Sequence, residues 1–240
     1  MAYRLSAKNL TLAILVGTTP LAGCAVSFGN TNASDVSAAP EGATASEVEL
    51  RERAAAMQRT VVEAIAAGGL AGAALNFVVG NRTRGTNLGF AGAFTTGAVL
   101  GGAAGSYVAY LQDQYATRED QLERVRADLR ANNAETEATL SVMRVVLANQ
   151  TEELNRLRAA VAASSGESAA LAREVSEARA NLNEMQRALE GAQARRTELS
   201  QSRSLIAGAQ PDPASDAEIA ALSERITQMR AVADALATQL

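Results

Sequence analysis

Residues 140–161 read LSVMRVVLANQTEELNRLRAAV, and their apolar positions recur at alternating spacings of three and four residues. This spacing places apolar side chains along one side of an α-helix and is typical of a coiled coil. The pattern continues past residue 168 and predicts a helical coil over residues 112–210. Its seam positions are Leu140, Met143, Leu147, Gln150, Leu154, Leu157, Val161, Leu171, Val175, Ala178, Leu182, Met185, Leu189, Ala192 and Leu199.

The coil has two predicted irregularities. Residues 122, 125 and 129 form an earlier apolar group, whose register would continue through Asn132, Thr136 and Thr139, so we expect a change of supercoiling near Met143. Residues 164–168, SSGES, are a second weak point, where the helix can bend or turn back as an antiparallel hairpin. The sequence does not choose between these geometries, and an isolated charged helix is the alternative for the whole region.

A shorter helix is predicted after the coil, in residues 211–240. Pro211 and Pro213 end the coil, and Ser215 and Glu218 have the spacing of a capping box. A helix that is apolar on one side needs a partner, and with 3% aromatic residues a second copy of the chain is favoured over a ligand. We therefore expect a homo-oligomer and no large globular core. The apolar stripe comprises Ile219, Leu222, Ile226, Met229, Leu236 and Leu240.

The first 24 residues have the layout of an export signal. Arg4 and Lys8 precede a short apolar run at residues 10–16, and LAGC at 21–24 ends in the chain's single cysteine, Cys24. The run is too short to span a hydrocarbon core of roughly 30 Å, which predicts removal of residues 1–23. Residues 24–45 are rich in small polar residues and are typical of a flexible tether. The alternative is an ordinary secretory signal beside a chance cysteine.

LAGC resembles the lipobox of bacterial lipoproteins. The resemblance implies that Cys24 carries acyl chains, which anchor the protein to membrane lipid. It also implies delivery to the outer membrane, facing the periplasm, because Ala25 and Val26 follow the cysteine in place of aspartate. The inner membrane is the alternative.

Residues 46–111 carry most of the glycines. A helix is predicted to begin near Ser46, which has capping-box spacing to Glu49, and two uncharged Gly/Ala-rich segments follow at 64–79 and 86–111. Small residues every fourth position let helices approach closely in lipid, which predicts a glycine-zipper hairpin in the membrane. A low-complexity linker and a soluble helix pair inside an oligomer are the alternatives. The predicted packing residues are Gly68, Gly72, Gly89, Gly97, Gly101 and Gly105.

Four residues near this hairpin are candidates for contact with lipid head groups. Tyr107 and Tyr110 lie where the second apolar segment meets charged sequence, a position that aromatic rings favour at a membrane interface. Arg82 and Arg84 lie in the predicted hairpin tip, although arginines in a turn are more often simply solvated.

Lipobox, tether and zipper together resemble the glycine-zipper lipoproteins of Gram-negative outer membranes, including the surface-antigen type. The resemblance covers residues 1–115 and ends in GAVLGGAAGSYVAYLQDQY, and the coil departs from it. It implies a small envelope protein that supports membrane integrity and is not an enzyme.

Composition excludes most chemistry. The chain has no histidine, its only cysteine is Cys24, and its only lysine is Lys8 in the signal, so no His-based triad, Schiff base, Walker A loop or Cys/His zinc site can form. We expect no catalytic residues, metal or cofactor. Without the two basic residues of the signal, 20 arginines face 26 acidic residues, and the net charge of about −6 argues against nucleic acid.

The sequence thus favours a structural envelope scaffold or spacer, which self-associates through the zipper and the coil, with an envelope protein as a candidate further partner. A pore, or an accessory of an export machine, is the alternative, and ion flux in reconstituted bilayers separates the two. The chain ends in Gln239 and Leu240 and not in lysine, so covalent attachment to peptidoglycan in the manner of murein lipoprotein is unsupported.

Overall fold

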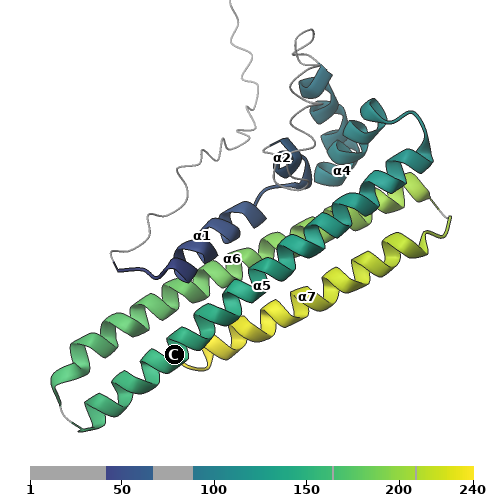
Figure 1. Ribbon diagram of the computed structural model, residues 1–240. Coiled ribbons are helices and arrows are strands. Elements are labelled where there is room, and N and C mark those ends of the chain that lie inside the picture. The colour runs from purple at the N-terminus through teal and green to yellow at the C-terminus, as the bar shows by residue number, and fades with distance from the viewer. Residues whose placement is uncertain (1–41, 67–88, 164, 209) are drawn as a thin grey trace, which may run out of the picture. The chain divides into compact units, whose positions relative to one another are not determined.

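The predicted coil forms two long helices that lie side by side in opposite directions (Figure 1). In the computed structural model, which describes residues 42–66, 89–163, 165–208 and 210–240, helix α5 spans Arg118–Ala163 and α6 spans Ser168–Ala207. A short 3-10 helix, Ser165–Glu167, lies between them. The chain therefore turns back at the predicted weak point. The all-α prediction is confirmed, and the described residues contain no strand.

Helix α7, Pro213–Ala237, runs parallel to α5. Successive contacts advance along both helices: the amide of Asn133 donates to Glu218 at 2.8 Å, Arg225 to Glu137 at 3.1 Å, and Arg144 to Gln228 at 2.8 Å. The parallel direction follows from this order, because the residue numbers increase together.

The predicted cap of α7 is wrong. Asp212 is the N-cap, and its carboxylate accepts hydrogen bonds from the backbone N–H of Ser215 at 3.4 Å and from the Ser215 hydroxyl at 2.6 Å. Pro213 occupies the first turn, where its fixed φ suits the helix and its missing N–H costs nothing. The helix therefore starts before Ser215.

Helix α1, Ala45–Met57, begins near Ser46 as predicted, but its cap differs from the predicted one. Its capping box consists of Thr44 and Glu47, and the Glu47 carboxylate accepts from the Thr44 N–H at 2.7 Å. Ser46 and Glu49 do not form the box. Glu49 instead pairs with Arg53 one turn later, at 2.7 Å, on the outer side of the helix.

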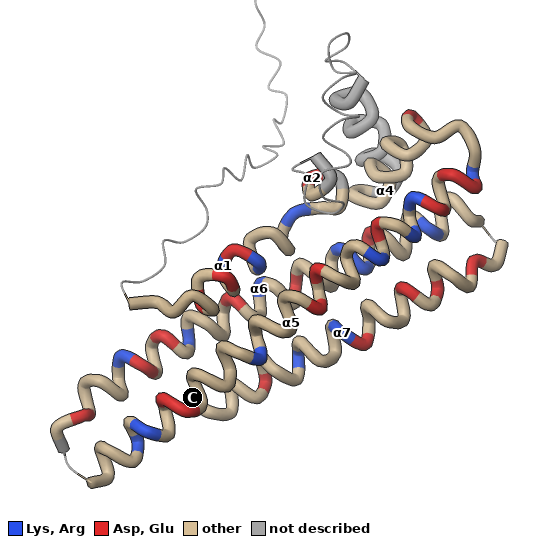
Figure 2. Tube along the Cα trace, viewed as in Figure 1, with Lys and Arg blue, Asp and Glu red and all other residues tan. Residues whose placement is uncertain are grey.

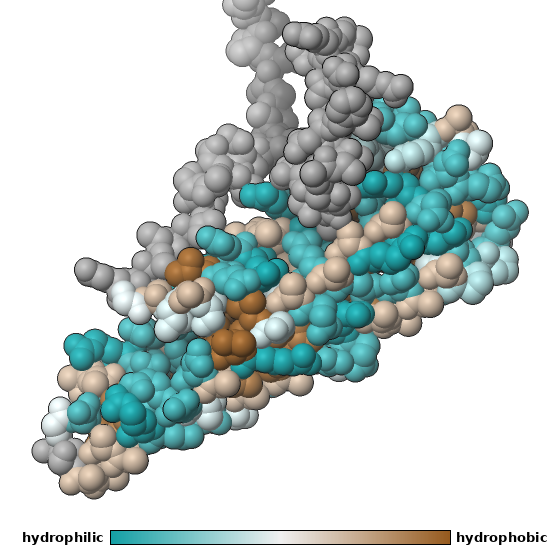
Figure 3. Space-filling model, in the orientation of Figure 1, coloured by the Kyte–Doolittle hydropathy of each residue, from teal (hydrophilic) through white to brown (hydrophobic). Residues whose placement is uncertain are grey.

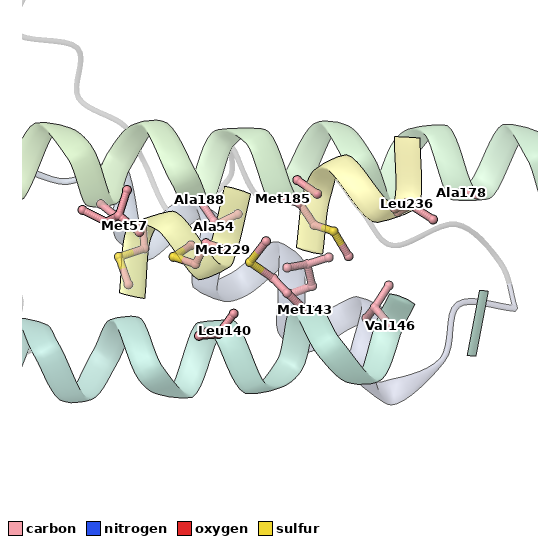
Figure 4. Packing of buried hydrophobic residues seen from close by; sticks show 14 of the residues in the cluster. Ala54, Met57, Leu140, Met143, Val146, Ala178, Met185, Ala188, Met229 and Leu236 are labelled. Carbon is pink, nitrogen blue, oxygen red and sulfur yellow. The ribbon is translucent and has the colours of Figure 1, made fainter. Parts of the chain in front are cut away.

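Helices α1 and α7 pack against different sides of the α5–α6 pair, and both contact α5 and α6 (Figure 1). We call these four helices the bundle. Figure 4 shows its core, where methionine and small side chains from all four helices meet. A sizeable core therefore exists, contrary to the expectation from sequence, because the chain covers its own apolar stripes. The buried core includes Leu50, Ala54, Met57, Leu140, Met143, Val146, Leu154, Met185, Ala188, Leu222, Met229 and Leu236.

Around the predicted change of register, the buried positions continue without a gap. Asn132, Thr136 and Thr139 are fully buried, as is Leu140 immediately after them. The threonine hydroxyls donate to backbone carbonyls one turn earlier, at 2.7 Å to Asn132 and 2.9 Å to Glu135, so they need no partner from another helix. Asn132, Thr136 and Thr139 thus continue the seam of residues 122, 125 and 129. This seam meets the one that begins at Leu140 without a break, at residues 139 and 140.

Two further helices pack near the beginning of α5 and the end of α6. Helix α2 spans Val61–Ala66 and α4 spans Gly89–Gln114, and α5 begins only at Arg118, so residues 112–114 belong to α4 and not to the coil. A second apolar cluster joins these elements, formed by Val61, Ala64, Tyr107, Leu111, Val125, Leu129 and Leu199. No helix within the described ranges combines the length and apolar character needed to cross a membrane.

Charged residues of both signs are distributed along α5, α6 and α7 (Figure 2). The visible face of the described residues is accordingly mostly hydrophilic, with a limited apolar area beside α1 (Figure 3). Among large apolar side chains that the structure describes, only Val145 and Leu205 are exposed. Most apolar surface is therefore covered within the chain.

Candidate functional site

Buried polar residues attach helices α1, α2 and α4 to α5 and α6. The first of these contacts surrounds Arg195 on α6, which is 1% exposed. Its guanidinium donates to the Glu135 carboxylate on α5 at 2.7 Å, to the carbonyl of Arg59 at 2.9 Å and to the carbonyl of Ala56. A cation here satisfies carbonyls at the C-terminal end of α1, where the helix dipole is negative. One side chain thus joins three helices.

A second polar contact holds the beginning of α1. The Glu47 carboxylate accepts from the amides of Asn181 on α6 at 2.5 Å and Gln150 on α5 at 3.0 Å. Burial alone would raise the pKa of Glu47, but hydrogen bonds from Thr44, Asn181 and Gln150 outweigh it and lower the pKa below its usual value. Arg51 donates to the other side of Asn181, at 3.4 Å. Glu47 therefore stays ionised while it links α1 to both long helices.

A third polar contact attaches α4. Tyr107 is fully buried, and its hydroxyl donates to Asp128 on α5. The Arg124 guanidinium donates to the same carboxylate at 3.0 Å. Burial raises the pKa of Asp128 although Arg124 acts against it, and burial together with Asp128 raises the pKa of Tyr107 well above its usual value. Ser202 on α6 adds a hydrogen bond to the carbonyl of Ala104 at 3.3 Å.

Glu198 on α6 attaches α2. Its Oε2 accepts from the backbone N–H of Val61 at 3.0 Å, and its Oε1 has no hydrogen-bond partner among the described residues. The side chain also lines a cavity of about 460 Å³ between α4 and α6. Burial raises the pKa of Glu198 to about 7, and the negative charge of Glu63 raises it as well. The hydrogen bond from the Val61 N–H and the positive charge of Arg195 act in the opposite direction. This carboxyl therefore changes charge near neutral pH.

We expect stability to fall between pH 5 and pH 8 because of Glu198. Below pH 4.5 the carboxyl is neutral in the folded and unfolded chain, so its contribution is fully present. Above pH 4.5 only the unfolded chain ionises freely, and the contribution, at most about 3 kcal/mol, is lost as the pH rises through about 7. Urea unfolding at several pH values checks this. Glu198→Gln should flatten the dependence, and an unchanged slope in that variant contradicts the assignment.

The structure places the residues predicted for the zipper and the lipid contacts as follows. Cys24, Gly68, Gly72, Arg82 and Arg84 lie outside the described residues. Gly89, Gly97 and Gly101 lie within α4, and Gly105 is buried in the same helix. Tyr107 is buried inside the protein, and Tyr110 is half-buried against the second apolar cluster.

The regular backbone of α4 is interrupted next to Gly101. Gly102 has a φ of +63°, in the left-handed region that side-chain-bearing residues rarely adopt. Glycine at position 102 therefore permits a backbone conformation that other residues rarely adopt.

The sequence contained a signal for Arg195 that the seam pattern alone did not reveal. The predicted seam passes from Ala192 to Leu199, and the position skipped between them, three residues after Ala192, is Arg195. A charged residue at a seam position indicates a buried ion pair. No comparable signal marks Asp128, because its burial depends on where α4 packs.

Among the described residues, these polar contacts attach helices to one another. Within the described ranges, no three Asp, Glu, Cys or His residues are grouped to hold a metal ion. Comparison of the chain with protein families, curated proteins and solved structures found no match.

Proposed function

We propose that this protein is a structural cell-envelope lipoprotein, anchored through Cys24 to the outer membrane, whose bundle acts as a scaffold or spacer in the periplasm. The main support for the proposal is that hydrogen bonds from buried polar residues attach α1, α2 and α4 to α5 and α6. Helix α4 contains part of the glycine-rich segment, so these contacts join that part of the segment and the two long helices into one unit, which suits a scaffold.

The dimensions of the bundle suit a spacer. Helix α5 contains 46 residues and is about 69 Å long at the standard rise of 1.5 Å per residue. The face of the described residues that Figure 3 shows is mostly hydrophilic, which suits an aqueous compartment.

Self-association is part of the proposal, and we assign it to the glycine zipper. The seam of the coil is buried within one chain, so it offers little apolar surface to a second copy. Light scattering of the detergent-solubilised protein should show more than one copy per particle, and a strict monomer would contradict this assignment.

Membrane fractionation followed by alkaline carbonate extraction tests the anchor and the zipper together. The processed wild-type chain should remain with the outer membrane. If exported Cys24→Ala also resists extraction, the glycine-rich segment associates with the bilayer in its own right. If Cys24→Ala is extracted while the wild type stays, the acyl chains alone hold the protein. A wild-type chain found in the soluble fraction would overturn the proposal.

A further inference from the structure

A cavity of about 340 Å³ lies where the first turn of α1 meets α5 and α6. Four carboxylates line it: Glu47 from α1, Glu153 from α5, and Glu174 and Glu177 from α6. The buried amide of Gln150 lines it as well. No part of the scaffold proposal uses this cavity.

The negative charge of the cavity is only partly compensated. Glu47 accepts hydrogen bonds from Thr44, Asn181 and Gln150, and Glu153 pairs with Arg156 at 2.6 Å. Neither Glu174 nor Glu177 forms an ion pair with any residue that the structure describes. Burial raises the pKa of Glu174, and the neighbouring carboxylates Glu177, Glu153 and Glu47 raise it further, whereas Arg156 lowers it. A positive charge in the cavity would relieve this repulsion.

Gln150 provides an independent indication of a ligand. The residue is 5% exposed, and its Nε2 is committed to the Glu47 carboxylate. This bond fixes the amide orientation, because an ionised carboxylate has no proton to donate. The Oε1 atom then has no hydrogen-bond partner among the described residues. Leaving a buried carbonyl oxygen unsatisfied is costly, so the cavity also needs a hydrogen-bond donor.

One chemical group meets both requirements. A primary ammonium group carries one positive charge and three N–H donors, so it can satisfy an amide oxygen and carboxylates together. A metal ion fits less well, since the carboxylates of the described residues are not grouped to coordinate one. We propose that this cavity binds a primary ammonium group, supplied either by a free polyamine or by a lysine side chain of another protein.

Isothermal titration of the purified full chain tests the proposal with three probes. Spermidine and Nα-acetyl-lysine amide carry primary ammonium groups, whereas tetramethylammonium has the charge without N–H donors. We expect saturable binding of at least one ammonium probe, and at least tenfold weaker binding of tetramethylammonium. Binding of the lysine amide supports a protein source, and binding of spermidine alone supports a free polyamine. Failure of both probes, or equal affinity for tetramethylammonium, overturns the proposal.

Paired variants separate the cavity from general attraction to an acidic protein. Glu174→Gln with Glu177→Gln should weaken binding at least tenfold. The control combines Glu152→Gln and Glu224→Gln, two exposed residues outside the cavity lining, and removes the same charge. Circular dichroism checks that both proteins remain folded. Equal losses in the two pairs overturn the assignment to this cavity.

Discussion

Arg195→Met should lower the free energy of unfolding by about 3 kcal/mol, at the lower end of the range for breaking a buried ion pair. The substitution preserves much of the apolar volume but leaves the carbonyl of Arg59 without its donor and the carbonyl of Ala56 with only the backbone N–H of Arg59, at 3.3 Å. Glu135 also loses its partner, although its side chain is 23% exposed and can regain some hydration. The effect should therefore be large without reaching the cost of a fully enclosed charge.

Urea denaturation followed by circular dichroism measures this loss. Arg196→Met is the matched control, since Arg196 is the next residue of α6 and is exposed. Its effect should lie within about 0.5 kcal/mol of zero, as for most surface substitutions. Similar stability losses in the two variants would mean that Arg195 does not act through its buried contacts.

Gly191→Ala should destabilise the protein by about 2 kcal/mol, as expected for overpacking at a close contact. A Cβ at this position of α6 would lie 2.5 Å from the carbonyl carbon of Met57 and 2.9 Å from its Cβ, so α1 would have to move. In an unobstructed helix the same change is favourable by up to about 1 kcal/mol, because alanine has the higher helix propensity. A loss of stability would thus indicate that α1 lies close to Gly191, and a gain would indicate that it does not.

Gly166→Ala is the control for this substitution. A Cβ at this position would meet nothing within 4 Å apart from its own chain neighbours, and the φ of Gly166 is not in the left-handed region, so we expect a change within about 0.5 kcal/mol. Hydrogen exchange adds a local measurement, because Gly191→Ala should accelerate exchange in α1 more than in α7. A stabilised Gly191→Ala variant would show that α1 does not approach α6 this closely.

The sequence pattern predicted which side of each long helix is buried, but not what covers it. Spacings of three and four residues identify a buried side from one helix alone, so Leu140, Met143 and Met185 could be assigned without knowing their neighbours. Their coverage by α1 and α7 depends on contacts between distant parts of the chain. The pattern therefore suggested a second copy where the chain itself supplies the partner.

The caps and polar contacts were harder to predict for a related reason. Ser46 and Ser215 have the same capping-box spacing as Thr44, and only the backbone conformation of the residues before the helix decides which is used. Asp128 resembles any acidic residue of a solvated helix until Tyr107 from α4 packs against it. Arg195 could have been recognised, because it interrupts an apolar seam.

The polar contacts of α1 also determine the order in which the protein can fold. Glu47 meets Asn181 and Arg195 meets the carbonyl of Ala56, pairs separated by 134 and 139 residues along the chain. Contacts of such separation close large loops and form slowly compared with the local turns of α5 and α6. During synthesis, residues 45–66 emerge well before α6 exists to receive them. We therefore expect α1 to pack late in folding, after α5 and α6 have already paired with each other.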